Sequence, residues 1–203
     1  MSRLPAWIGQ HLAAVRAIIV LTVITGFIYP LVVLGIGQAA FHNQANGSLV
    51  SANGKVVGSS LLCQEFMDAK GNPLPQYFQP RPSTASAANS KTDFGCDPNY
   101  SGASNLGPNN TTLLQNIQQR KAAYAKLNGV PASSVPPDAV TTSGSGLDPY
   151  ISPQNAYLQV NRVASARHLS PAQVRTLGFL GEPRVNVLAL NMALDELSAK
   201  PGS

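Results

Sequence analysis

The sequence predicts an α+β protein with one N-terminal transmembrane helix, followed by a single small extracytoplasmic domain of short strands and several helices. Three observations lead to this fold class. Residues 17–40 form one apolar run, residues 48–62 alternate in polarity around an Asn-Gly pair, and residues after 110 return to helical spacing.

The apolar run is long enough to cross a membrane. It holds no ionisable side chain except Tyr29, and as an α-helix it would be roughly 36 Å long, against about 30 Å of hydrocarbon core. A buried core helix would carry a polar face, which this run lacks. A cleaved signal peptide, with Gly37 and Ala39 just before the cleavage site, is disfavoured by the length of the run and by Pro30.

We therefore expect three segments: a lead-in over residues 1–16, a transmembrane helix over 17–41 and one domain over 42–203. The lead-in holds Arg3 and Arg16 and no acidic residue. Because positive charge stays on the cytoplasmic side, the N-terminus is expected in the cytoplasm and the domain in the periplasm or outside the cell. The chain would be a single-pass protein of the inner (plasma) membrane, in contact with the lipid bilayer.

Small side chains line one face of the predicted membrane helix. Drawn at 100° per residue, Thr22, Pro30, Val33 and Gly37 all fall at or within about 40° of Gly26. Small residues let a neighbouring helix approach closely, so this face is a candidate docking surface, although Gly and Pro are common in such helices anyway. Pro30 also removes a backbone hydrogen bond, and we expect a kink near Gly26.

A β-hairpin is predicted just after the membrane. Asn53-Gly54 between two alternating arms is typical of a type I′ turn. A short extended piece is expected at Tyr77 and Phe78. Residues 83–110 lack periodicity, and a loop of this length is expected to be functional or partly mobile.

Helices are predicted for most of the second half. Apolar residues recur at helical spacing from Leu113 to Leu127, and Asn128-Gly129 ends that helix. A short strand is expected over residues 138–142.

Two Ser-Pro pairs then mark helix starts. Ser152-Pro153 predicts a helix to about residue 167, and Ser170-Pro171 predicts a shorter one to about residue 181. A last helix over residues 186–197 presents one face composed of Val187, Leu190, Asn191, Leu194 and Leu197.

Composition narrows the function classes. Charged residues make up 11% of the chain, the net charge is +5, and 17 Gly with 16 Pro predict many turns. No run of Lys and Arg interleaves with aromatic residues, so nucleic-acid binding has no support.

The two cysteines, Cys63 and Cys96, both fall in the expected outer domain. An oxidising compartment favours a disulfide between them, while two separate buried thiols remain the alternative. No His or second Cys pair lies at ligand spacing, so the cysteines do not indicate a metal site.

The search for catalytic residues finds little. Gly144-Ser145-Gly146 lacks the flanking residues of a nucleophile elbow, and no phosphate-binding loop is present. A chain with one membrane span and an outer domain without recognisable catalytic motifs is best explained as an accessory subunit. A membrane-anchored periplasmic enzyme using Ser145, or an adaptor unrelated to transport, is the alternative.

Several longer motifs resemble one family. They are ITGFIYPLVV in the apolar run, QANGSL just after it, YFQPRPSTA from residue 77, SGASNLGPNN from 101, VTTSGSGLDPYISP from 140, QVNRVASAR from 159 and LGEPRVNVLALNMALD before the end. In this order they resemble the C subunits of Kdp potassium-transporting P-type ATPases (the KdpC family). The likeness covers nearly the whole chain.

The resemblance implies a non-catalytic accessory subunit of a high-affinity, ATP-driven potassium uptake complex. Its partners would be a channel-like A subunit and an ATP-hydrolysing B subunit. The family is described as a catalytic chaperone that raises the ATP affinity of the hydrolysing subunit. The resemblance implies no cofactor held by this chain: ATP would act through the complex, and K⁺ would be handled by the other subunits.

Four motif residues are candidates for contact with the A subunit: Asn105, Ser145, Asp148 and Asn186. Their first interpretation is structural, as turn and cap formers. The chain departs from the family pattern at Cys63, where a small residue is usual, and around Cys96. The disulfide is therefore argued from the compartment alone.

Overall fold

The computed structural model describes residues 5–86, 95–176 and 184–199. The chain forms two compact units, Met1–Ser48 and Leu49–Ser203, and each is treated by itself. Helices and short strands mix in the second unit, which confirms the α+β prediction.

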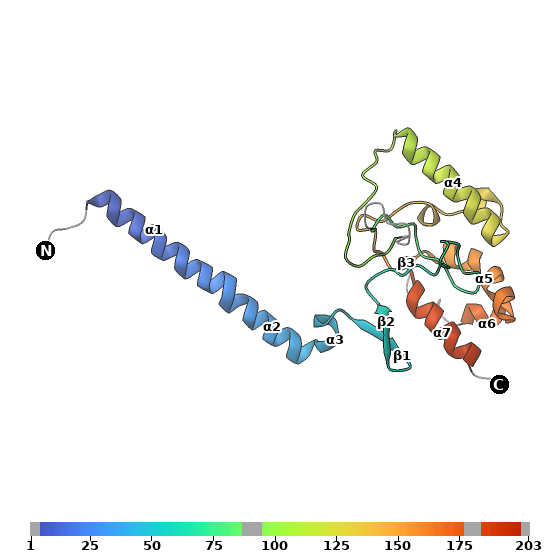
Figure 1. Ribbon diagram of the computed structural model, residues 1–203, viewed down its shortest axis with the longest axis horizontal. Helices are drawn as coiled ribbons and strands as arrows, with labels where there is room; N and C mark the ends of the chain where they lie inside the picture. Colours follow the sequence, from blue (N-terminus) through green and yellow to red (C-terminus); the bar gives the residue numbers. More distant parts are fainter. Residues whose placement is uncertain (1–4, 87–94, 177–183, 200–203) are drawn as a thin grey trace. The chain divides into compact units, whose positions relative to one another are not determined.

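The first unit is one long apolar helix and a short helical turn (Figure 1). Helix α1 (Ala6–Val23) continues into a π-helical turn, η1 (Ile24–Ile28), then α2 (Tyr29–Ala40) and α3 (His42–Ala45). The helix therefore begins well before residue 17, and most of the expected lead-in is helical. Pro30 explains the π turn, because it has no N–H for the carbonyl of Gly26 and a wider turn re-pairs the backbone.

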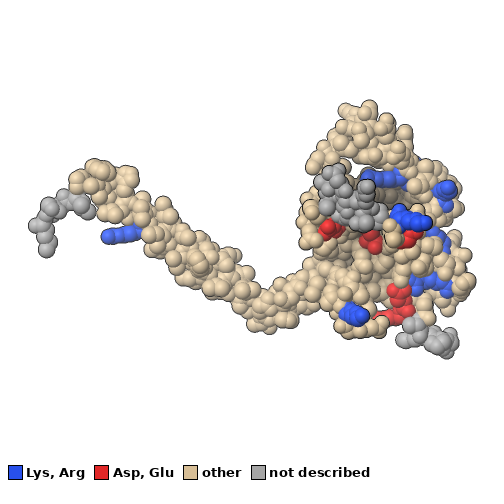
Figure 2. Space-filling view, viewed as in Figure 1, with Lys and Arg blue, Asp and Glu red and all other residues tan. Residues whose placement is uncertain are grey.

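Ala6–Ala40 is the only helix among the described residues that is long and apolar enough to cross a membrane, and none of its apolar window is buried. Arg16 is the only Lys, Arg, Asp or Glu between residues 5 and 48. The helix is accordingly almost uniform in colour in the charge-coloured view (Figure 2).

The second unit opens with the predicted hairpin. Strands β1 (Leu49–Ala52) and β2 (Lys55–Ser59) pair antiparallel, with a bulge between Val50 and Ser51. Asn53 (φ 50°) and Gly54 (φ 74°) both adopt left-handed conformations, which is the geometry of a type I′ turn.

Helix α4 (Thr111–Asn128) begins at Asn110, whose side chain accepts from the backbone N–H of Thr112, and ends at Gly129 in the left-handed conformation. The strand predicted over residues 138–142 is wrong. Pro137–Ala139 form a 3₁₀ turn (η3), preceded by another, η2 (Ala132–Ser134). The Asp138 carboxylate accepts from the backbone N–H and hydroxyl of Ser152, which holds this segment away from any sheet.

Helix α5 (Pro153–Arg167) starts at Ser152 as predicted, with the serine hydroxyl oxygen accepting from the N–H of Asn155. Helix α6 (Pro171–Thr176) also starts as predicted, and its expected end near residue 181 lies outside the described residues. Strands β3 (Tyr150–Ile151) and β4 (Val185–Asn186) form a short antiparallel pair before α7 (Val187–Ala199).

The core of this unit lies among α5, α6 and α7, with α4 on the far side of α5 from α7 (Figure 1). Fully buried side chains from α5 and α7 pack on Phe78, which has no exposed surface. The members of this core include Phe78, Ile151, Val160, Val163, Val187, Leu190 and Leu194. The predicted inner face of the last helix is therefore correct from Val187 to Leu194.

Candidate functional site

Buried side-chain amides, in place of a neighbouring strand, hold the segment Tyr77–Gln79. The N–H of Gln79 donates to Oε1 of Gln159 (2.8 Å), and Nε2 of Gln159 donates back to the Gln79 carbonyl (3.2 Å). Asn191 makes the same pair of bonds with the backbone of Phe78, at 2.8 and 2.9 Å. Side-chain amides thus replace the neighbouring strand, because every buried backbone N–H and carbonyl needs a partner.

The Gln79 side chain is itself held in one orientation. Its Nε2 donates to the carbonyls of Phe66, Leu74 and Tyr77 at 3.0–3.3 Å. Arg162 reinforces the same segment, since it donates to the Pro75 and Tyr77 carbonyls and to Gln159. Burial lowers the pKa of Arg162 to about 10, which leaves it charged at neutral pH.

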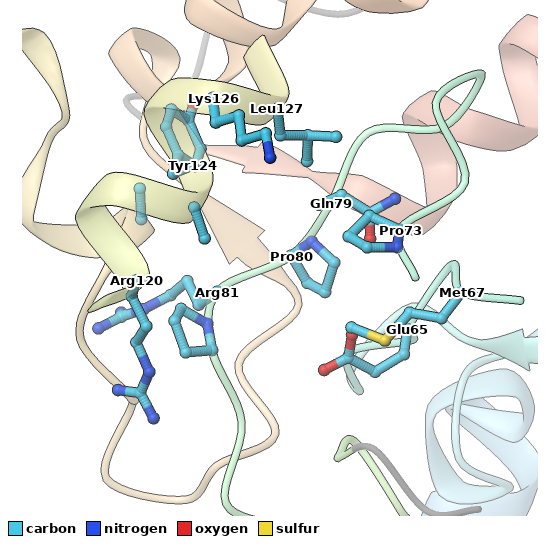
Figure 3. Close-up of a pocket in the computed structure, with 13 residues that line it drawn as sticks. Glu65, Met67, Pro73, Gln79, Pro80, Arg81, Arg120, Tyr124, Lys126 and Leu127 are labelled. Atoms are coloured by element: carbon cyan, nitrogen blue, oxygen red, sulfur yellow. The ribbon is translucent and has the colours of Figure 1, made fainter. Parts of the chain in front are cut away.

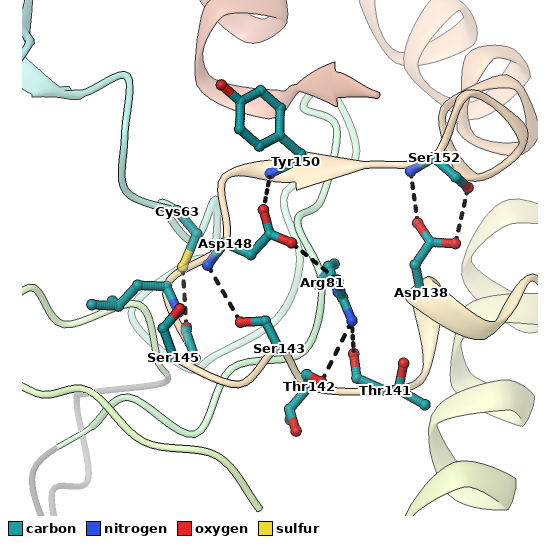
Figure 4. Close-up of polar contacts among 12 residues, drawn as sticks. Cys63, Arg81, Asp138, Thr141, Thr142, Ser143, Ser145, Asp148, Tyr150 and Ser152 are labelled. Atoms are coloured by element: carbon teal, nitrogen blue, oxygen red, sulfur yellow. Dashed lines mark hydrogen bonds and ion pairs between the residues drawn. The ribbon is translucent and has the colours of Figure 1, made fainter. Parts of the chain in front are cut away.

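Arg81 joins this segment to the loop before β3 (Figure 4). Its Nη1 lies 3.0 Å from Oδ2 of Asp148, and Nη2 lies 3.4 Å from the Thr142 carbonyl. The other oxygen of Asp148 accepts from the N–H of Tyr150. These contacts favour the structural interpretation of Asp148, as a residue that shapes a turn.

The loop around Ser145 is clamped from several sides. Cys63 and Cys96 form a disulfide with their Cα atoms 5.4 Å apart, which is the pair favoured by the compartment argument. The Ser83 hydroxyl donates to the Gly146 carbonyl (2.6 Å) and accepts from the N–H of Cys96 (2.8 Å).

Ser145 itself serves this loop. Its hydroxyl oxygen accepts from the N–H of Leu147, and its carbonyl accepts from the N–H of Gly102. No His or carboxylate hydrogen-bonds to that hydroxyl within the part of the chain that the structure describes, so a serine nucleophile has no support from the geometry.

The other two motif residues are not brought together with Ser145 and Asp148 in one hydrogen-bonded cluster. Asn186 caps α7, with Oδ1 accepting from the N–H of Ala189, and its Nδ2 donates to the Ser60 carbonyl. Asn105 adopts a left-handed conformation (φ 52°), as expected of a turn former.

The small-residue face of the membrane helix is changed by the π turn. The prediction assumed α-helical spacing throughout, whereas η1 contains Gly26 and lies between Thr22 and Pro30. A π turn holds more residues than an α turn, so it rotates Pro30, Val33 and Gly37 about the helix axis relative to Thr22. Thr22, Gly26, Pro30 and Val33 are exposed and Gly37 is half-buried, its space for a Cβ facing Ala45 of α3.

Sequence reasoning missed a cavity of about 670 Å³ between α4 and residues 65–82 (Figure 3). Helix α4 forms one wall, with Glu65, Met67 and Pro73 opposite. Three cationic side chains line it, namely Arg81, Arg120 and Lys126. No sequence signal marks this site, because its lining comes from separate stretches that only folding brings together.

Two side-chain atoms of lining residues, Oε1 of Gln79 and Nε of Arg81, have almost no accessible surface and no hydrogen-bond partner among the described residues. Both residues line the cavity. Among the described residues of the lining, Glu65 is the only anionic one, and burial raises its pKa to about 7. Glu65 is then only partly ionised at neutral pH and Arg81 is paired with Asp148, so Arg120 and Lys126 give the described lining a net positive charge.

No group of three or more His, Cys, Asp or Glu able to hold a metal ion occurs among residues 5–86, 95–176 and 184–199. Three of the four motif residues, namely Ser145, Asp148 and Asn186, make hydrogen bonds within the chain. This geometry offers no metal centre for catalysis in the described region.

Comparison with known proteins decides the family. The family model of KdpC, described as the c chain of the K⁺-transporting ATPase, matches residues 11–196. This chain belongs to the KdpC family. The KdpC subunit of Mycobacterium tuberculosis (strain H37Rv) is 50% identical over 199 residues, covering 93% of this chain and 98% of the relative.

Two further KdpC relatives agree. The potassium-transporting ATPase KdpC subunit of Streptomyces avermitilis is 47% identical, covering 92% of this chain and 93% of the relative. That of Kineococcus radiotolerans is 48% identical, covering 87% and 88%. The resemblance in the motifs is confirmed, and the chain is a KdpC-type subunit of a K⁺-transporting ATPase complex.

Proposed function

We propose that this chain is a non-catalytic accessory subunit of an ATP-driven potassium uptake complex, needed for its assembly and stability. The observation that carries this proposal is the match to KdpC subunits along almost the whole length of both chains. The hydrogen-bonding of Ser145 and Asp148, which leaves neither poised as a nucleophile or base, supports a role without chemistry of its own.

In this proposal a channel-like A subunit takes up K⁺ and a B subunit hydrolyses ATP. The chain raises the ATP affinity of the B subunit, acting as a catalytic chaperone. It does so indirectly, through its membrane helix, because ATP is cytoplasmic and only a short N-terminal part of this chain lies on that side.

The orientation is proposed from charge and from the cysteines. Arg3 and Arg16 precede the apolar run with no acidic residue beside them, which favours a cytoplasmic N-terminus. The Cys63–Cys96 disulfide is of the kind that persists in oxidising compartments, which supports a periplasmic or extracellular second unit.

Two experiments on native membranes test these statements. Affinity purification of a tagged copy of the chain should recover a multi-span subunit and a P-type ATPase; recovery of neither rejects the accessory role. Protease added to sealed right-side-out vesicles should digest residues beyond 41, whereas protection of that part reverses the orientation.

Photolabelling of the intact complex with azido-ATP tests the indirect route. Label is expected on the hydrolysing subunit. Label on residues 49–203 of this chain would instead mean direct contact with the nucleotide.

Gly26 is the residue through which the proposed docking face is best tested. A Cβ placed there would meet only Thr22 Cγ2 at 3.9 Å, so Gly26→Leu fits the chain's own helix and its effect reports on a neighbour. We expect weaker co-purification with the partner subunits. Gly35→Leu is the matched control, since Gly35 also has open space but lies across α2 from Val33 and Gly37. Equal loss in both variants would remove the docking face.

A further inference from the structure

The disulfide lies beside a carboxyl group. Sγ of Cys96 is 4.0 Å from Oε1 of Glu65, and Glu65 also lines the cavity beside α4 (Figure 3). The other sulfur has a different neighbour, since Sγ of Cys63 lies 3.4 Å from the Gly146 carbonyl oxygen. A carboxylate can take up the proton of a thiol, whereas a backbone carbonyl can only accept a hydrogen bond from it. The two cysteines are therefore chemically unequal.

Close packing at Gly95 brings the carboxyl to Cys96. A Cβ at position 95 would lie 3.1 Å from Oε1 of Glu65 and 2.8 Å from Cβ of Ser83. Since contacts this short displace one of the atoms, a larger residue there would push the Glu65 carboxyl away. Glycine at this position leaves the carboxyl room to approach the sulfur of the next residue.

Both cysteines are also held by hydrogen bonds that do not involve their sulfur atoms. The N–H of Cys96 donates to the Ser83 hydroxyl oxygen, and that hydroxyl donates to the Gly146 carbonyl. The N–H of Cys63 donates to the Leu147 carbonyl at 2.9 Å. These bonds do not require the sulfur–sulfur link, so they favour a dithiol form in which the two thiols stay close together.

Burial governs the acidity of Glu65. This residue forms no ion pair within the part of the chain that the structure describes, and its neighbours Ser83, Gly95 and Cys96 carry no charge. The charged or titratable side chains that share the cavity with it are Arg81, Arg120, Tyr124 and Lys126. Burial raises the pKa of Glu65 to about 7, so this carboxyl can both take up and release a proton near neutral pH.

We propose that Cys63 and Cys96 form a reversible thiol–disulfide site for low-molecular-weight disulfides, with Glu65 as the proton acceptor for the Cys96 thiol when the bond closes. Each cysteine has 7% of its surface exposed, which favours a small reagent over another protein. The inference is independent of the proposed function, because it concerns chemistry within this chain alone.

Closure takes two steps. The Cys63 thiolate, its proton lost to water, attacks a disulfide RSSR; a Cys63–SR bond forms, the RS–SR bond breaks and RS⁻ leaves. The Cys96 proton then moves to the Glu65 carboxylate as the Cys96 sulfur attacks Sγ of Cys63; the Cys63–Cys96 bond forms, the Cys63–SR bond breaks and a second RS⁻ leaves. Two protein thiols are oxidised and RSSR is reduced to two thiolates. Opening by a thiol reverses these steps, and protonated Glu65 returns the proton to Cys96.

The pH profile of the second step tests this role in the full chain. The chain is reduced in detergent, mixed with excess hydroxyethyl disulfide, quenched with acid and alkylated, and the products are mapped by mass spectrometry. Decay of the mixed disulfide at Cys63 gives the rate of the second step. In the unchanged chain this rate should rise as Glu65 ionises and level off above about pH 7.

Glu65→Gln preserves the size of the side chain but removes its ability to take up a proton. It should slow the second step about a hundredfold at pH 7, the lower end of what a positioned proton acceptor contributes. The two rates should converge near about pH 9, where a thiol ionises without help. Glu65→Asp, which keeps a carboxyl with a shorter reach, should retain the plateau at an intermediate rate.

Asp97→Asn is the matched control. Asp97 follows Cys96 in the sequence, but its Oδ1 accepts from the N–H and Nδ2 of Asn99, so this change should leave the profile as it was. Equal rates for Glu65→Gln and the unchanged chain at pH 7 would overturn the proposal, as would equal slowing by Asp97→Asn or loss of the plateau in Glu65→Asp. A faster rate for Glu65→Gln at every pH would also overturn it, because the carboxylate would then only repel the thiolate. Failure of the unchanged, reduced chain to close would do the same.

Discussion

Asn191→Leu is the substitution that best separates polar from apolar contributions to this fold. Asn191 lies in the apolar face of α7 with 1% of its surface exposed, so burial of a leucine there would be worth about 1.5–3 kcal/mol. The change, however, deprives the N–H and carbonyl of Phe78 of their partners. Two buried unpaired groups cost about 1–3 kcal/mol each, so the balance is a loss of about 2 kcal/mol.

The assay is thermal unfolding of the full chain in detergent, followed by tyrosine near-ultraviolet circular dichroism. A loss of that size should lower the midpoint by about 4–8 °C for a unit of this length. Ala189→Leu is the control, because Ala189 is exposed on the same helix and the change should have almost no effect. An Asn191→Leu midpoint equal to or above the unchanged chain would refute the view that this amide replaces a strand.

Three further changes test other parts of the fold. Burial raises the pKa of Glu65 to about 7. The contribution of this carboxyl to the free energy of unfolding is therefore fully present below about pH 4.5, and up to about 3 kcal/mol is lost as the pH rises through about 7. Glu65→Gln should flatten that pH dependence; an unchanged slope would mean that other groups cause it. Replacing Cys63 and Cys96 by Ser opens a link between residues 33 apart and should cost about 3–4 kcal/mol in denaturant unfolding; an unchanged midpoint would count against that link. Gly146→Ala should be much more destabilising than Gly54→Ala, because both have positive φ but only a Cβ at 146 would lie 2.6 Å from the Gly102 carbonyl; equal losses would mean that backbone conformation alone matters.

Local signals in the sequence predicted the elements whose causes are local. Asn53-Gly54 forms its turn through the positive φ values of two adjacent residues. Ser152 caps the start of α5 by accepting a hydrogen bond from the N–H of the residue three positions later. The apolar run needs only its own composition to form a helix in lipid. In each case the deciding interaction lies within a few residues, where a sequence pattern can show it.

The predictions from sequence fail where contacts between residues far apart in the chain determine the local structure. Residues 138–142 have the composition of a strand, but the Asp138 carboxylate is engaged by Ser152 and Asn155. The pairing of β3 with β4 joins two short segments far apart in the chain.

The cavity beside α4 was out of reach for the same reason. Gln79 and Arg81 lie in a recognised motif, yet their unpartnered atoms emerge only once Gln159, Asp148 and neighbouring carbonyls have taken the other donors and acceptors. Which polar atoms are left without a hydrogen-bond partner can be determined only from the folded structure.

ATP hydrolysis by the purified complex, measured with and without this chain at saturating K⁺, tests the central claim most directly. The account predicts that the isolated chain hydrolyses no ATP, that the complex lacking it has a raised KM for ATP, and that adding the chain back restores the lower KM. Hydrolysis by the isolated chain, or a KM that does not depend on its presence, would contradict the account.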